Sequence, residues 1–146
     1  GSPEENSNDI ANAGNILINA NDSIKVDGEN SGLATSLLRG KGKGGEIQIT
    51  TGSLSVTNDA SLSTTTNGQG NAANIRINAS DNVTFDQKSS AFASVYENAI
   101  GDGGDIEITT GSLSVRDESL IATSTLGKGD AGNITINANI FSATNG

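Results

Sequence analysis

Apolar residues alternate with polar ones in short runs along most of this chain. Ile16 and Ile18 are followed by Ile24 and Val26, two such pairs return in each of the next three repeats, and one pair returns in the last. Alternation with a period of two puts one set of side chains on one face of a β-strand, so the pattern predicts strands with one buried face. The predicted core consists of Ile16, Ile18, Ile24, Val26, Ile47, Ile49, Leu54, Val56, Ile75, Ile77, Val83, Phe85, Ile106, Ile108, Leu113, Val115, Ile134 and Ile136.

A third, weaker apolar cluster follows these two pairs, at residues 33–35, 62–64, 92–94 and 121–123. We therefore expect three short strands in each unit, followed by a glycine-rich turn. The connections carry no regular Asn-Gly or Asp-Gly pair, which argues against hairpins. No apolar pattern with a period of 3.6 residues persists, so helices are not expected.

The chain also repeats itself almost literally. Segment 45–72 recurs 59 residues later as segment 104–131, and the stretches between the two copies match each other as well. Equivalent positions at residues 14, 45, 73, 104 and 132 are separated by steps of 31, 28, 31 and 28 residues, so long and short units alternate. We interpret Gly14, Gly45, Gly104 and Gly132 as turn glycines, and we expect the extra residues of long units to bulge at the connections.

Stacking of like strands explains this repeat better than pairing within a unit. If each unit forms one coil, equivalent isoleucines lie above one another at intervals of about 4.8 Å and pair in parallel. The prediction is an all-β, single-stranded parallel β-helix, or β-solenoid, of about 4.5 coils, with three short strands per coil. Its repeat domain spans 14–146, with coils at 14–44, 45–72, 73–103, 104–131 and a partial coil at 132–146.

The two ends of the chain have a different character. The opening Gly-Ser is typical of a cloning scar, and the last unit stops partway at Gly146. We interpret residues 1–13 as this scar and the end of a preceding turn or cap. The whole chain is then a piece of a longer protein, and we expect its exposed coils to permit end-to-end self-association.

Two outward columns differ in chemistry. One holds Leu17, Gln48, Arg76, Glu107 and Thr135, which share no property and indicate a solvated wall. The other holds Asn19, Thr50, Asn78, Thr109 and Asn137, and stacked amide and hydroxyl groups of this kind are expected to form a polar ladder along the axis.

Composition and charge exclude several function classes. The chain is 33% hydrophobic and carries a formal net charge of −9, with no basic cluster larger than Arg39, Lys41 and Lys43, so nucleic acid and anionic membrane are not expected partners. Cys, His, Met and Trp are all absent. Disulfides, Cys/His zinc sites and histidine acid/base chemistry are therefore excluded, and we expect no cofactor and no metal. No hydrophobic run is long enough to span a membrane.

Three motifs together resemble a known family. The pattern (G/A)-N-I-x-I-N-A begins at residues 14, 73 and 132, G-S-L-S-V begins at 52 and 111, and G-x-G-(N/D)-A-(A/G) begins at 68 and 127. They look like the repeats of filamentous haemagglutinin-type exoproteins, large bacterial adhesins exported by two-partner secretion, and the resemblance covers nearly all of 14–138. It implies a right-handed β-helix that forms the shaft of a secreted or cell-surface protein involved in cell adhesion. The amino-terminal secretion domain of that family is not recognisable here.

Glycine-rich segments at 40–45 and 127–132 match the dinucleotide-binding pattern G-x-G-x-x-G. That site needs a strand before the glycines and a helix N-terminus after them, whereas here each match precedes a predicted strand. We interpret both as turns. Segment 101–105 has a faint likeness to a calcium-binding β-helix repeat, but the equivalent positions of other coils do not preserve it.

Paired carboxylates are the remaining candidates for chemistry. Asp27 and Asp86 are equivalent, as are Glu46 and Asp105, and each pair is two coils or about 9.6 Å apart, a distance that inverting glycosidases also use. No aromatic platform for sugar is evident, and Tyr96 is the only tyrosine. Charged groups on a solvated face explain these residues more simply, so no catalytic residue is assigned.

Our leading hypothesis is a non-catalytic structural shaft of a secreted or surface-attached adhesin-like protein, which extends a distal binding region. Its partners would be the neighbouring repeats of a longer parent chain. The alternative is direct binding of a carbohydrate, surface glycan or host receptor by one outward face. A carbohydrate-active β-helix enzyme is a third hypothesis, and it would depend on the carboxylates named above.

Overall fold

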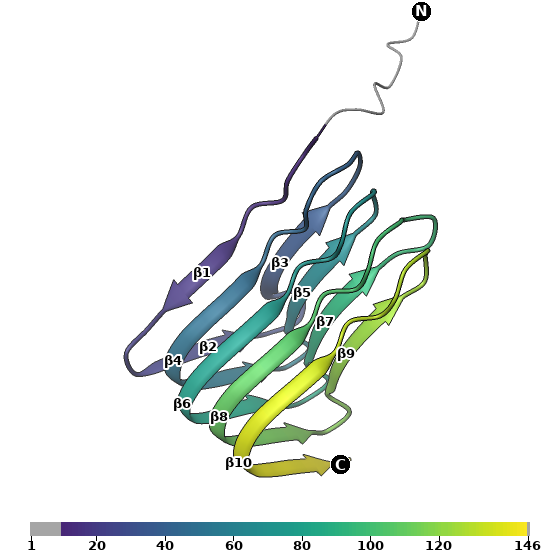
Figure 1. The fold of residues 1–146 in the computed structure, drawn as a ribbon. Coiled ribbons are helices and arrows are strands. Elements are labelled where there is room, and N and C mark those ends of the chain that lie inside the picture. Colours follow the sequence, from purple (N-terminus) through teal and green to yellow (C-terminus); the bar gives the residue numbers. More distant parts are fainter. Residues whose placement is uncertain (1–9, 146) are drawn as a thin grey trace, which may run out of the picture.

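The computed structural model describes residues 10–145, which form two parallel sheets and contain no helix (Figure 1). The chain winds through both sheets as a right-handed parallel β-solenoid, so the predicted fold class is confirmed. The first sheet contains β1 (Ile16–Asn19), β2 (Ser23–Asp27), β4 (Ile47–Thr57), β6 (Ile75–Phe85), β8 (Ile106–Arg116) and β10 (Ile134–Thr144). The second contains β3 (Gly32–Leu37), β5 (Ser61–Thr66), β7 (Ser90–Val95) and β9 (Leu120–Thr125). The part of the predicted terminal scar and cap at 1–9, and Gly146, lie outside the described residues.

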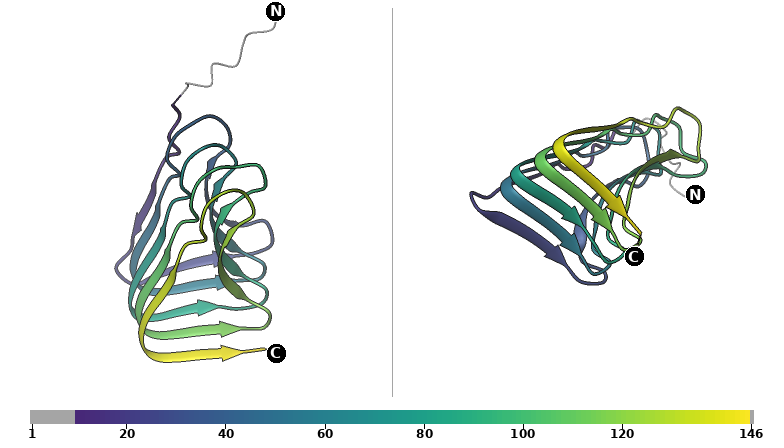
Figure 2. Two further views of the ribbon diagram at one scale, coloured as in Figure 1. Left: turned by 45° about the vertical axis from the view of Figure 1, so that its right-hand side comes forward. Right: turned by 90° about the horizontal axis from the view of Figure 1, so that it is seen from below.

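Equivalent residues of successive coils pair in register. Ile16, Ile47, Ile75, Ile106 and Ile134 follow one another across five strands, as the repeat predicted. Both views in Figure 2 show these strands stacked in sequence order, from purple to yellow. Each coil therefore pairs only with the coils next to it, which is the arrangement of a solenoid.

The number of strands per coil differs from the prediction. In the second to fifth coils the first two predicted strands are one continuous strand of 11 residues that bends at a corner (Figure 1). Only the first coil keeps them apart, as β1 and β2. The prediction of three separate strands was wrong for the later coils because strand pairing continues around the bend.

A bulge at this corner explains one extra residue of a long coil. Where β4 pairs with β6 the register shifts, and Ser80 and Asp81 of the long coil both oppose Gly52 of the short coil. In the next short coil, a Cβ atom on Gly111 would lie 2.7 Å from the carbonyl oxygen of Asp81. The glycine that opens each G-S-L-S-V motif is thus required by close approach of the neighbouring bulge.

The alternation of corner lengths ends in the fifth coil. Phe141 pairs with Leu113, and β8 and β10 pair from Ile134 to Thr144 without an extra residue at the corner. This register directs Phe141 and Ala143 toward the core side, in the columns of Leu113 and Val115. The fifth coil therefore has a short-type corner.

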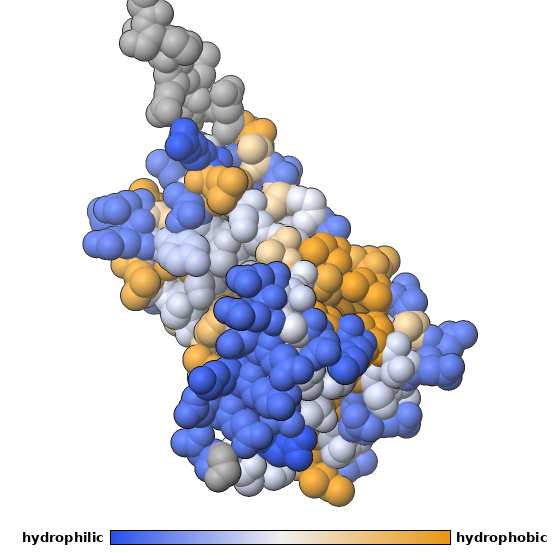
Figure 3. All heavy atoms as spheres, turned by 180° about the vertical axis from the view of Figure 1, so that it is seen from behind, coloured by the Kyte–Doolittle hydropathy of each residue, from blue (hydrophilic) through white to orange (hydrophobic). Residues whose placement is uncertain are grey.

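The predicted core is buried in the middle of the solenoid and open at its ends. Ile47, Ile49, Leu54, Val56, Ile75, Ile77, Val83, Phe85, Ile106, Ile108 and Leu113 are buried. Ile16, Ile18, Ile24, Val26, Val115 and Ile136 are half-buried. Ile134 is 42% exposed, so its assignment to the buried core was wrong: among the described residues it pairs with a neighbouring coil on one side only, through Ile106. An apolar patch is visible in Figure 3, which views the molecule from behind, where the half-buried side chains of the first coil lie.

The third apolar cluster of the third coil, at 92–94, does not align with the cluster at 62–64 as the repeat suggested. In β7, Phe92 opposes Ser63 of β5, while Ala91 opposes Leu62, so Ala91 points inward and Phe92 points outward. The turn before β7 lacks the extra residue that the first coil has there. The third coil carries its additional length in the loop after β7 instead.

Threonine hydroxyls extend into the core and bond across it. Thr64 Oγ1 donates to the carbonyl oxygen of Ala73 at 2.6 Å, Thr123 Oγ1 donates to that of Gly132 at 2.7 Å, and Thr35 bonds to Gly45 in the same way. These bonds connect the second sheet to the segment that enters the next coil. Thr66 Oγ1 is buried but has no hydrogen-bond partner among the residues described.

The predicted turn glycines act differently from expectation. A Cβ atom on Gly45, Gly104 or Gly132 would collide with backbone of the preceding coil, whereas one on Gly14 meets nothing within 4 Å. None of the four has a left-handed φ. Three of them are needed for close packing between coils, and Gly14 is not.

Candidate functional site

Asparagine and aspartate side chains in the loops before the long strands connect each coil to the next. Asn71 Oδ1 accepts a hydrogen bond from the backbone N–H of Asp102 at 2.9 Å, and Asn74 Oδ1 accepts one from Asp105 at 2.8 Å. The carboxylates of Asp102 and Asp105 accept in turn from the next coil, at 3.0 Å and 2.7 Å. The residues of the predicted calcium-like segment therefore serve as acceptors for backbone N–H groups.

This row of acceptors replaces the polar ladder expected in the column of Asn19, Thr50, Asn78, Thr109 and Asn137. That column is in register. Within residues 10–145, however, no side-chain hydrogen bond joins its members. The axial bonds lie in the loops because loop N–H groups lack the regular ladder of a sheet and need other acceptors.

The second coil interrupts this row with Lys43 and Glu46. A shallow hollow of about 450 Å³ lies at this interruption. It is lined by Asn15, Lys43, Gly44, Glu46, Asn71, Ala72, Ala73 and Asn74. The hollow contains one carboxylate and no second acid with which that carboxylate could act, so it lacks the paired groups of a glycosidase site.

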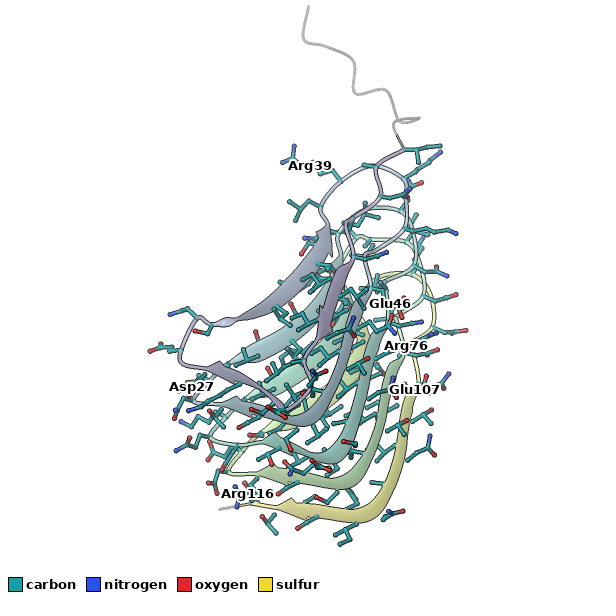
Figure 4. All side chains as sticks on the ribbon, turned by 90° about the vertical axis from the view of Figure 1, so that its left-hand side faces the viewer. Asp27, Arg39, Glu46, Arg76, Glu107 and Arg116 are labelled. Atoms are coloured by element: carbon teal, nitrogen blue, oxygen red, sulfur yellow. The ribbon has the colours of Figure 1, made fainter. Side chains whose placement is uncertain are left out.

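Charged residues of opposite sign stack beside this hollow. Arg76 Nε lies 3.1 Å from Glu46 Oε1 and 4.0 Å from Glu107 Oε2. Figure 4 shows the three labelled side chains close together at one side of the solenoid, whereas Arg39 projects away from them. All three are partly exposed, so each pair contributes only about 0–1 kcal/mol.

Asp27 is fully engaged by its neighbours. Its Oδ1 accepts hydrogen bonds from Thr57 Oγ1 at 2.7 Å and Asn58 Nδ2 at 2.6 Å, and Lys25 Nζ lies 3.2 Å from Oδ2. The bonds from Thr57 and Asn58, followed by Lys25, lower the pKa of Asp27 below its usual value. A carboxylate stabilised in this way is a poor general acid at neutral pH.

Asp86 pairs with the following coil and not with Asp27. Arg116 Nη2 lies 2.7 Å from Asp86 Oδ2, and the backbone N–H of Gln87 donates to Oδ1 at 2.9 Å. The nearby Asp86 carboxylate raises the pKa of Asp117. The structure thus brings Asp86 beside Asp117, a pair that the sequence analysis did not select, and does not unite either carboxylate pair that it did consider.

A tight turn positions Asp117. Asp117 and Glu118 have left-handed φ angles of 49° and 63°, and the N–H of Ser119 donates to the carbonyl of Arg116 at 3.0 Å. These features match a type I′ turn, although the sequence lacks the Asn-Gly pair that usually signals one. A second open hollow of about 490 Å³ lies along these turns, lined by Gln87, Lys88, Asp117, Glu118 and Asn145.

Both glycine-rich matches lie in loops that enter a long strand, β4 or β10, and no helix follows them. Isolated parallel bridges join each loop to the next, first Lys41 to Gln69, then Gln69 to Ile100, and then Ile100 to Lys128. These segments are loops that connect the two sheets, and they do not form the phosphate-binding arrangement. In residues 10–145, no group of three or more acidic side chains is placed to hold a metal ion.

None of the described elements is a helix long and apolar enough to cross a membrane.

No protein-family model, curated protein or solved structure gives a significant match to this chain. Functional interpretation therefore depends on the fold and on the chemistry of its outer walls.

The two sheets present very different outer walls. The outward residues of the first sheet include Lys25, Arg76 and Glu107, and polar Asn and Thr columns. Along β3, β5, β7 and β9, the outward residues are only Gly, Ala, Ser, Thr, Phe92 and Leu120. We call this second surface the neutral wall. Sequence reasoning missed it because it aligned the apolar cluster at 92–94 with the one at 62–64, one residue away from the register that the structure has.

Proposed function

We propose that this chain is a non-catalytic structural shaft, a rigid segment that holds a distal binding region away from a bacterial surface or secreted filament. The observation that supports the proposal is the coil-on-coil register, in which the same columns pass through all five long-strand positions. Each additional coil repeats the same contacts. Length therefore increases linearly, by about 4.8 Å per coil.

Axial side-chain bonds support a rigid shaft. Asn and Asp acceptors, the core threonines and the Arg76 row all join neighbouring coils. Bending the solenoid would open one side of each coil interface and break several of these contacts together. The candidate acids also make their bonds along the axis, which favours a structural role over an acid/base role.

Secretion and cell-surface location are part of the same proposal and derive from the family resemblance. Protease treatment of intact bacteria that express the full-length parent protein tests this part. A shaft that stays protected inside intact cells would contradict it.

The shaft itself is tested by lengthening it. The chain has no cysteine, so Asn19→Cys and Asn137→Cys introduce two unique label sites in one outward column. These sites are four coil steps apart, so we expect about 19 Å between their backbones. Insertion of a second copy of residues 45–103 adds two coils. It should lengthen the distance between the two spin labels, measured by double electron–electron resonance, by about 10 Å.

The distribution of distances must also stay narrow. A glycine- and serine-rich insert of equal length provides the matched control, because a flexible linker broadens the distribution. If the duplicated pair broadens it as much as the flexible insert does, the segment is no rigid shaft.

A further inference from the structure

Asn67 and Gly68 form an Asn-Gly pair in the loop that follows β5. The side chain of Asn67 is exposed, and Gly68 is half-buried. Figure 1 shows this loop in the stack of loops that leave the second sheet. Asparagine is among the thermolabile residues of proteins, because the backbone nitrogen of the next residue can attack its side-chain amide. A glycine at the next position leaves that nitrogen without the shielding of a side chain.

The N–H group of Gly68 supplies the attacking nitrogen, and it makes no hydrogen bond to any of residues 10–145. Other loop asparagines precede N–H groups that are engaged. After Asn30, the N–H of Ser31 donates to the carbonyl oxygen of Gly28 at 3.0 Å. Carbonyl oxygens also accept from the N–H groups that follow Asn58, Asn71, Asn74 and Asn98. Such a bond must break before the nitrogen can attack, so Asn67 lacks a protection that these asparagines have.

We propose that Asn67 is a site of spontaneous deamidation. The Gly68 nitrogen gives its proton to water or hydroxide and attacks Cγ of Asn67, so that a new C–N bond forms while the bond from Cγ to the side-chain nitrogen breaks. That nitrogen takes a proton from the solvent and leaves as ammonia, and a five-membered succinimide ring remains. Water then adds to either ring carbonyl and breaks its C–N bond, which gives aspartate or isoaspartate. The net reaction consumes one water and releases one ammonia, and it needs no oxidant, reductant or second protein.

Packing between coils requires the glycine of this pair but not the asparagine. A Cβ atom on Gly68 would lie 2.5 Å from the carbonyl oxygen of Gly40 in the preceding coil. In the next short coil Gly127 holds the equivalent position, and its Cβ would meet a backbone oxygen at 2.2 Å. Leu126 takes the place of Asn67 there, and the N–H groups of both residues donate to the preceding coil. The fold therefore fixes the glycine, and the asparagine alone makes the pair reactive.

The isoaspartate product should weaken the stack of coils. It routes the chain through the side-chain carbons of residue 67, which adds one backbone bond of about 1.5 Å before Gly68. The carbonyl of Gly68 accepts from the N–H of Ile100 at 3.1 Å, and the N–H of Gln69 donates to the carbonyl of Gly40 at 2.8 Å. The loop is thus bonded to the coils on both sides, and a longer backbone disturbs both interfaces. This inference goes beyond the shaft function and does not depend on it.

Ageing of the folded chain at mildly alkaline pH, followed by peptide mapping with mass spectrometry, tests the site. Trypsin separates Asn67 from Asn30 and from Asn145, which begins the other Asn-Gly pair of the sequence. Ser31→Gly provides the matched control, because it creates an Asn-Gly pair at the exposed Asn30 whose glycine N–H is hydrogen-bonded. We expect Asn67 to deamidate about fivefold faster than Asn30 in this variant, the factor that corresponds to one backbone hydrogen bond. In concentrated urea, where the fold is lost, the two rates should become similar.

The effect on the fold has its own measurement. Urea unfolding of the aged chain should show a less stable fraction that contains isoaspartate, whereas aged Asn67→Gln should keep its original midpoint. Circular dichroism checks that both variants are folded before ageing. If Asn67 stays intact in the folded chain while it reacts in urea, the proposal is wrong. Equal rates at Asn67 and Asn30 in the folded Ser31→Gly variant would overturn its structural basis, because the dipeptide alone would then set the rate.

Discussion

The hydroxyl of Thr66 permits a direct test of how the core of this solenoid is stabilised. Thr66 is fully buried, and its Oγ1 atom has no hydrogen-bond partner among the described residues. Its neighbours in the same inward column are Leu37 and Val95, both apolar and buried. Valine has nearly the shape of threonine, so Thr66→Val should fit without rearrangement.

The magnitude follows from two contributions. A buried polar group without a partner costs about 1–3 kcal/mol, and a buried methyl group contributes about 0.8 kcal/mol. Because part of each contribution is lost to local adjustment, we expect Thr66→Val to raise the free energy of unfolding by about 1–2 kcal/mol. At this chain length, each kcal/mol corresponds to about 3 °C in Tm.

Thr64→Val provides a control of opposite sign. Thr64 is two residues away on the same face of β5 and is equally buried, but its hydroxyl donates to the carbonyl oxygen of Ala73 at 2.6 Å. Removing this donor leaves a partly buried carbonyl without that bond, so we expect stability to fall by about 1 kcal/mol. The two variants are chemically the same change and should differ by about 2–3 kcal/mol.

Urea unfolding followed by far-UV circular dichroism measures both variants. The slope of the free energy with urea should stay the same, so that the midpoints report stability alone. If both substitutions shift the midpoint in the same direction, hydrogen bonding does not distinguish the two sites. The assignment of Thr66 as an unpaired group would then be wrong.

Three further predictions concern packing, pH and the solenoid ends. Gly111→Ala should lower Tm by several degrees, because its Cβ would meet a backbone oxygen at 2.7 Å, whereas Gly14→Ala should be tolerated. Asp117→Asn should stabilise the fold at pH 7. The Asp86 carboxylate raises the pKa of Asp117, so the contribution of Asp117 to native stability is greatest below its unfolded pKa and is lost as pH rises through its native pKa. The neutral asparagine avoids this loss. The difference in unfolding free energy between this variant and the unmodified chain should shrink as pH falls below about 4. A difference that is independent of pH would refute the charge explanation. Phe141 is 56% exposed on the last coil, so Phe141→Lys should reduce the concentration-dependent light scattering that end-to-end stacking causes. Scattering that is already flat for the unmodified chain would contradict this prediction.

The candidate site was less predictable than the fold. The carboxylates of Asp27 and Asp86 share a column, but hydrogen bonds and ion pairs form with the adjacent coil and not with the equivalent residue two coils away. The sequence feature that would have predicted these contacts is a separation of about 30 residues between two opposite charges, as between Asp86 and Arg116. The order of elements around the glycine-rich motifs argued correctly against a phosphate site, because each motif lies in a loop before a strand.

Phe92 shows where a repeat pattern is insufficient. An apolar residue near the expected position was aligned with Leu62, yet the coil places Ala91 there. Periodicity of two makes a shift of one residue decisive, because it moves every side chain to the other face. The length of the preceding turn sets this choice, and turn length is variable between coils.

By itself, the sequence determined that the repeat units of this chain form coils that stack on one another. Near-identical units with inward aliphatic residues specify parallel coils, because each unit can bury its apolar face only against its neighbours. Only the tertiary structure decided which face each third strand presents, where strands continue around a corner, and which polar groups bond across coils. Those features depend on backbone positions in adjacent coils, about 30 residues apart in sequence, where a single bulge or turn residue changes the register. The neutral wall is one consequence of that register.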